Sequence, residues 1–224
     1  MRILFILWVL LINWQINAQI NRMDANGERH GVWIKKYRNG NTRYSGKFNH
    51  GKEVGVFKYY SLANPKVPII IKTFNTIDDI SFNQFFSTSG KLLSEGKMQK
   101  KKRIGKWVYY HTDATTIMQE EFYIDGKLDG KSITYFKNKK PTIIAHYKEG
   151  LLHGSYKRYS VKGKIYQDVH YKNGKLDGLA IYYNRLTGLI TKKGRYTNDI
   201  KTGIWEFYFE GKLNDTKDFS PKKK

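Results

Sequence analysis

Histidine and carboxylate side chains are the groups that could bind a metal ion or move a proton, and the chain has six histidines and 19 Asp and Glu residues. His30 and His153 each precede a recurring glycine, where an aspartate stands elsewhere, so their register assigns them to turns. No helical pair of histidines flanked by a glutamate is present to bind zinc. The histidines on predicted strands are scattered over three units: His111, His146 and His170. We therefore expect no metal and no cofactor.

The acidic residues also lack the spacing that calcium or acid–base chemistry requires. Asp125 and Asp129 lie in a glycine-containing turn, but their spacing is wrong for a calcium loop and Lys127 lies between them. Glu120–Glu121 and Asp78–Asp79 are adjacent pairs, which a strand directs to opposite faces, so they make poor general acid–base partners. No Gly-Xaa-Ser-Xaa-Gly sequence and no phosphate-binding loop is present. We expect no catalytic residues and no enzyme activity.

The elements that carry these residues repeat along the chain. A marker glycine precedes an aromatic strand every 24 or 25 residues, at Gly31, Gly55, Gly105, Gly130, Gly154, Gly178 and Gly203. The gap from Gly55 to Gly105 is two steps long, and Ile80 at its midpoint predicts an eighth, degenerate unit. Such a period indicates an array whose units must stack to bury their apolar faces. The units begin near residues 26, 49, 75, 99, 124, 148, 172 and 197.

Two aromatic columns follow the marker glycine and predict strands. The first lies two residues after it in six units: Trp33, Phe57, Phe82, Trp107, Tyr156 and Trp205. The second lies five residues after it in seven units: Tyr60, Phe85, Tyr110, Tyr135, Tyr159, Tyr183 and Tyr208. A spacing of three does not keep both columns on one face of a regular strand, so either a bulge intervenes or both faces are partly covered. The strict phase favours core packing over stacking on the bases or sugars of a ligand.

A second strand and a tight turn complete each unit. Ile143, Ala145 and Tyr147 show the alternation of such a strand. Asp125-Gly126 and Asn173-Gly174 are dipeptides typical of turns that need a positive φ. We therefore predict an all-β fold, a repeat array of about eight stacked β-hairpins that forms an elongated, twisted antiparallel meander.

The repeat resembles a known family. The segments Tyr171-Lys172-Asn173-Gly174-Lys175-Leu176-Asp177-Gly178 and Gly203-Ile204-Trp205-Glu206-Phe207-Tyr208 are similar to MORN (membrane occupation and recognition nexus) repeats, in the variant of bacterial YwqK-like, antitoxin-type proteins. The resemblance covers roughly residues 26–219. It implies stacked hairpins without shared catalytic residues, in arrays that serve as scaffolds, membrane-surface binders or protein adaptors. The third unit departs from the pattern, with Asn75-Thr76-Ile77-Asp78-Asp79-Ile80 in place of the usual turn.

Residues 1–19 read as a secretory signal peptide. Arg2 is followed by ten apolar residues, Ile3 to Ile12, and Ala18 is a suitable cleavage point. A spanning helix needs about 20 apolar residues, so the run is too short for one, and an uncleaved anchor or buried helix is the alternative. Without cysteine the chain has neither a lipid-attachment site nor a disulfide. We expect export to the periplasm, cell surface or medium, with residues 20–224 as a single repeat domain.

The charge of the chain bears on its partners. The formal net charge is +22, spread along the array with a dense segment at Lys100, Lys101, Lys102 and Arg103, our candidate patch for an anionic partner. A solvated basic surface without a specific ligand is the plainer interpretation. The leading hypothesis is a protein-interaction adaptor at the cell envelope, and attachment to an anionic membrane or cell-wall polysaccharide is the second. An antitoxin role ranks third, because export separates the chain from a cytoplasmic toxin, and nucleic acid ranks last for the same reason.

Overall fold

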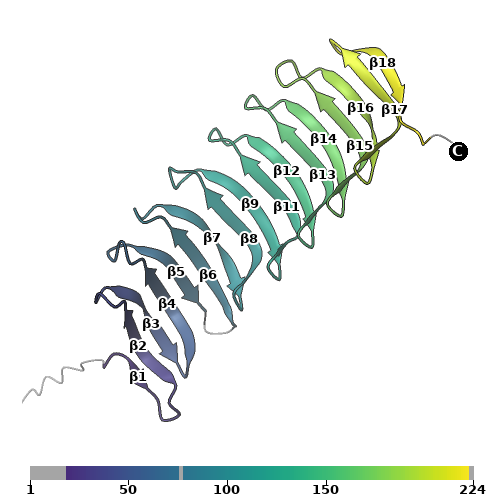
Figure 1. Ribbon diagram of the computed structural model, residues 1–224. Helices are drawn as coiled ribbons and strands as arrows, with labels where there is room; N and C mark the ends of the chain where they lie inside the picture. Colours follow the sequence, from purple (N-terminus) through teal and green to yellow (C-terminus); the bar gives the residue numbers. More distant parts are fainter. Residues whose placement is uncertain (1–18, 76–77, 222–224) are drawn as a thin grey trace, which may run out of the picture.

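The computed structural model describes residues 19–75 and 78–221, which form one open antiparallel β-sheet (Figure 1). Successive hairpins stack side by side, so the sheet is a meander that runs from β1 at one edge to β18 at the other. The expected all-β array of hairpins is confirmed. The expected cleavage site at Ala18 lies outside the described residues, and none of the described residues forms a helix long and apolar enough to cross a membrane.

The chain contributes eighteen strands. Eight two-stranded units would give sixteen; the two others are β1, a short edge strand, and β10, which shares β9 with β11. The strands are β1 (Arg22–Met23), β2 (Arg29–Lys36), β3 (Thr42–Asn49), β4 (Lys52–Tyr60), β5 (Pro68–Phe74), β6 (Ile80–Phe86), β7 (Leu92–Gln99), β8 (Lys102–Tyr110), β9 (Ile117–Ile124), β10 (Lys127–Leu128), β11 (Gly130–Tyr135), β12 (Pro141–Lys148), β13 (Leu151–Tyr159), β14 (Ile165–Lys172), β15 (Lys175–Tyr183), β16 (Ile190–Thr197), β17 (Ile200–Phe209) and β18 (Lys212–Asp218).

Six of the seven marker glycines, all except Gly31, lie in bulges near the start of the first strand of a unit. Between β3 and β4, for example, Ser45 pairs with Lys58 and Lys47 with Val54, so β4 carries two extra residues around Gly55. Gly55 has a φ of 66°, a left-handed conformation that glycine adopts without a clash. The periodic glycine is therefore a requirement of the backbone at each bulge.

A second bulge settles how the two aromatic columns are arranged. Tyr109 pairs with Gln119 and Tyr110 with Ile117, so the extra residue lies in the second strand and the first strand keeps its alternation. The hydroxyl of Tyr110 donates to Glu95, whose backbone pairs with Val108, on the face opposite Trp107. Both faces are thus partly covered by aromatic side chains, one column on each, except in the third unit, where Phe85 of the second column lies on the core face beside Trp107 and Phe82 of the first column lies on the other face.

The core runs along the face that carries the first column, and each ring packs on a small neighbour. Phe57, Trp107 and Trp205 are completely buried. A Cβ added to Gly194 would lie 2.2 Å from the Trp205 ring, and Gly96 stands in the same relation to Trp107. These glycines were not singled out in the sequence, because they are the facing surface of the core and not part of the marker repeat.

In the third unit, the marker position predicted from the sequence, Ile80, is wrong by one residue. Ser81, and not Ile80, pairs with Met98 in the way that Gly105 pairs with Tyr123. Asn83 consequently occupies the core position and is completely buried, whereas Phe82 points to the other face and is 39% exposed. The cause is the absent glycine: β5 and β6 pair without a bulge, which shifts the phase of this unit.

Turns also join neighbouring hairpins. The backbone N–H of Gly126 donates to the carbonyl oxygen of Arg103 at 2.9 Å, and that of Gly150 donates to Leu128 at 2.7 Å. The array ends at β18, in which every residue is exposed, and Phe219 closes the core with its ring edge-on to Trp205. The repeat thus stacks through strands, rings and turns together.

Candidate binding surface

The face opposite the core carries one continuous line of side chains, which we call the outer row. In each unit, the outer row consists of the residue that follows the marker position and of the residue that pairs with it on the next strand. Val32 and Lys47 are one such pair. Its members, in spatial order, are Val32, Lys47, Val56, Thr73, Phe82, Lys97, Lys106, Phe122, Lys131, His146, Ser155, His170, Leu179, Arg195, Ile204 and Asp218. Sixteen strands at about 4.8 Å give the row a length of about 70 Å.

Exposed apolar and cationic side chains make up most of the outer row. Phe122, Leu179 and Ile204 are 44%, 42% and 66% exposed. The basic members are Lys47, Lys97, Lys106, Lys131 and Arg195, and Asp218 at the far end is the single acid. Lys106 forms an ion pair with Glu120, whereas the other four cations have no ion pair within the described chain. The row therefore presents cationic side chains between apolar ones, and four of these cations form no ion pair among the described residues.

The core face is occupied by contacts within the protein. The Arg103 guanidinium lies 4.4 Å from the centre of the Trp107 ring, the Lys201 ammonium lies 4.4 Å from that of Trp205, and Arg29 covers Phe48 at 4.1 Å. Each of these cations thus makes a cation–π contact with an aromatic ring of the same chain. This arrangement agrees with the expectation that the phased rings are core rather than a stacking surface for bases or sugars.

A polar network beside Trp107 was not foreseen from the sequence. Arg103 donates to the hydroxyls of Tyr109 and Tyr123 at 2.6 and 3.0 Å, and Tyr123 donates to the buried Glu121 at 2.6 Å. Burial first, and then the hydrogen bonds with Tyr123 and Glu121, raise the pKa of Tyr109 far above its ordinary value. Glu120 bonds instead to Tyr135 on the opposite face, so the adjacent carboxylates are separated as predicted.

The candidate patch at residues 100–103 divides into two parts. Lys100 and Lys101 lie exposed in the turn after β7. Lys102 pairs with Asp125 at 2.8 Å, and Arg103 is committed to its tyrosine partners. Lys100 and Lys101 form no ion pair among the described residues, and they border a hollow of about 540 Å³.

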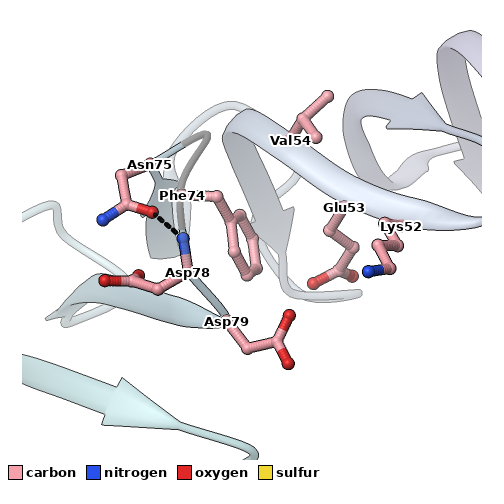
Figure 2. A pocket seen from close by; sticks show the side chains of 7 residues that line it. All are labelled: Lys52, Glu53, Val54, Phe74, Asn75, Asp78 and Asp79. Carbon is pink, nitrogen blue, oxygen red and sulfur yellow. Dashed lines mark hydrogen bonds between the residues drawn. The ribbon is translucent and has the colours of Figure 1, made fainter.

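A smaller cavity of about 280 Å³ lies beside the third unit (Figure 2). Glu53 lines it from β4, and its carboxylate accepts a hydrogen bond from the Tyr59 hydroxyl at 2.9 Å. The carboxylates of Asp78 and Asp79 point to opposite sides of their loop, while the Asp78 backbone N–H donates to Asn75. The lining residues therefore bring no nucleophile and base together.

The histidines fall into two groups. Four contact a backbone carbonyl or a side-chain amide of their own surroundings: His111, His146, His153 and His170. His30 and His50 instead lie next to Asp24, with ligand atoms within 4.8 Å of one another. Sequence reasoning compared His30 with its counterpart His153 and missed this group, because Asp24 precedes the first unit and His50 lies in a turn of the next one.

Comparison with known proteins supplies no relative. A scan against protein-family models gives no match to this chain, and a search of curated proteins finds no similar sequence. The function must therefore be argued from the sheet and its side chains.

Proposed function

We propose that this chain is a non-enzymatic MORN-type scaffold at the cell envelope, which binds an acidic segment of another protein along its outer row. The proposal rests on the composition of that row. It has four cations without an ion pair in the described part of the chain, several exposed apolar side chains and a single acid. Charge complementarity favours an acidic partner, and the apolar members favour one that also offers hydrophobic contacts.

The spacing of the row suits an extended polypeptide. Val32, Val56 and Phe82 lie on alternate strands β2, β4 and β6, about 9.6 Å apart. A polypeptide in the polyproline II conformation rises about 3.1 Å per residue with three residues per turn, so every third side chain lies on one face and recurs about every 9.3 Å, close to the spacing of the apolar positions. The partner would then lie across the strands, with acidic residues opposite the lysines. The predicted leader at residues 1–19 would take the complex to the envelope.

The test is crosslinking in cells, followed by affinity recovery of the full chain and elution over a salt gradient. Two charge-reversal variants are compared: Lys97→Glu with Lys131→Glu on the outer row, and Lys137→Glu with Lys162→Glu in exposed turns off it. We expect one protein to remain bound through high salt to the wild type and to the turn variant, and to be lost from the row variant. Equal recovery by all three chains, or no protein above a charge-matched control, would contradict the proposal.

The positive charge of the chain also motivates a second candidate, binding to an anionic membrane surface or cell-wall polymer. Such binding would depend on the charge. It would therefore weaken as salt is added, because salt screens exposed charges beyond about one Debye length. Vesicles with and without phosphatidylglycerol distinguish the two candidates. Loss of binding between about 50 and 500 mM salt, equally in both charge-reversal variants, would favour the anionic surface.

A further inference from the structure

Asp24, His30 and His50 come from three separate segments at the N-terminal end of the array. Asp24 lies in the turn between β1 and β2, His30 lies in β2, and His50 lies in the turn between β3 and β4. The rings of His30 and His50 are 4.8 Å apart, and one ligand atom of each of the three residues lies within 4.8 Å of the others. Hairpin stacking thus brings together two imidazoles and one carboxylate.

The Asp24 carboxylate is held in place by the backbone. Its Oδ1 accepts hydrogen bonds from the backbone N–H groups of Asn26 and Glu28, both at 2.9 Å. Its Oδ2 faces His50, whose Nδ1 lies 2.6 Å away. The Asp24 side chain is only 9% exposed, whereas His50 is open to solvent at 61%. One carboxylate oxygen is therefore aimed outward at an accessible imidazole, while the other fixes its orientation.

His30 leaves both of its ring nitrogens free for a ligand. Its ring stacks obliquely on His50 and makes no hydrogen bond among the described residues. Its counterpart His153, which also precedes a marker glycine, has Asn173 as a partner at 3.3 Å. At two equivalent positions, therefore, the His153 ring has a hydrogen-bond partner, whereas the His30 ring contacts the His50 ring.

We propose that Asp24, His30 and His50 form a binding site for a divalent transition-metal ion, with Zn²⁺ the best fit. Two imidazole nitrogens and one carboxylate oxygen are ligands that zinc takes, and they leave a fourth tetrahedral position for water. Mg²⁺ and Ca²⁺ prefer sets made of oxygen alone. In a tetrahedral site the ligand atoms lie about 3.3 Å apart, so the two exposed rings rotate slightly while Asp24 stays fixed.

Metal binding has a defined structural effect at this end of the sheet. The ion takes the place of the proton between His50 and Asp24 and joins the β1–β2 turn to the β3–β4 turn. The Glu28 carboxylate, which lies over Gly51 next to His50, adds negative charge beside the cation. The two-residue strand β1 is thereby fastened to the array.

The test is Zn²⁺ binding by the full chain without a histidine tag, measured by competition with a chromophoric chelator and by the visible spectrum of the Co²⁺ form. We expect one ion per chain, binding at least tenfold weaker in His30→Ala and His50→Ala, and unchanged binding in His153→Ala. Mg²⁺ should not compete. Melting of each variant without metal checks that it is folded.

Amide hydrogen exchange supplies an independent readout. Zn²⁺ should slow exchange across residues 22–30 of the wild type and of His153→Ala, but not of His50→Ala. The proposal is overturned if the wild type binds no Zn²⁺, or if the three histidine variants bind it equally. It is also overturned if bound Zn²⁺ leaves exchange at β1 unchanged.

Discussion

At the scale of single residues, this protein is built on rings that lie directly against glycine. Trp205 fills the space that a side chain at position 194 would need, and Trp107 does the same at Gly96. Protein interiors are close-packed, so the contact restricts the ring to one position. It also leaves no room for a larger residue in place of the glycine. The energetic consequences can be measured at each member of the pair.

Gly194→Ala should lower the free energy of unfolding by about 1–3 kcal/mol, because its methyl group overlaps the Trp205 ring. A double-mutant cycle by chemical denaturation isolates the cause. In a Trp205→Ala background the same change should cost almost nothing, since the space is then empty. An equal cost in both backgrounds would show that the strain is in the backbone.

Trp107→Ala should cost about 3–5 kcal/mol, because the ring is completely buried. Trp33→Ala serves as the comparison, since Trp33 remains partly exposed and should cost less. Denaturant unfolding of both variants measures the difference. A loss below about 1 kcal/mol for Trp107 would show instead that its ring is free to contact a ligand.

At the scale of the repeat unit, the bulge around the marker glycine is the defining element. It allows a strand to gain two residues against its neighbour while the hairpins remain stacked. The third unit does without it and places a buried asparagine, Asn83, where other units use aromatic or small residues. That exception shows that stacking survives the loss of one bulge.

Gly130→Val tests the bulge. Gly130 has a φ of 103°, where a β-branched side chain is strained, so the variant should lose about 1–3 kcal/mol. Lys131→Val is the matched control, since the Lys131 side chain is exposed and the backbone of Lys131 does not have a positive φ. Thermal unfolding with a wild-type midpoint for Gly130→Val would refute the requirement for glycine.

The hairpin array could be predicted because glycine and aromatic residues recur with one phase. The register of the third unit could not, because Ile80 and Ser81 both lack the glycine that marks the others and the phase shifts by a single residue. The glycines under the rings carry no signal of their own in the sequence. The outer row and the Asp24 cluster depend on cross-strand neighbours, which become visible only when the strands are aligned.

At the scale of the whole molecule, partly buried tyrosines are spread along the sheet. Burial first, and then Glu95, raise the pKa of Tyr110 to about 12, and burial with Glu120 has the same effect on Tyr135. Burial also raises the pKa of Tyr171 and Tyr183. The folded chain therefore retains phenolic protons that the unfolded chain releases near pH 10.

Stability should consequently fall as the pH rises from about 10 to about 12. In this window the unfolded state binds fewer protons than the folded state, so the free energy of unfolding decreases with pH. Denaturant unfolding across this range measures the slope. Tyr110→Phe should make the decline shallower, whereas Tyr37→Phe serves as the control. A slope that Tyr110→Phe leaves unchanged would contradict the prediction.

The last strand, β18, has a consequence for how copies of this chain behave together. A meander has two free edges, and an edge with unpaired backbone groups can accept a strand from another copy and grow into a filament. Lys212, Asp215, Lys217 and Asp218 occupy β18, and all are exposed. Adding a copy there would strip water from these charges. We therefore expect this charged edge to oppose the edge-to-edge addition of a second copy.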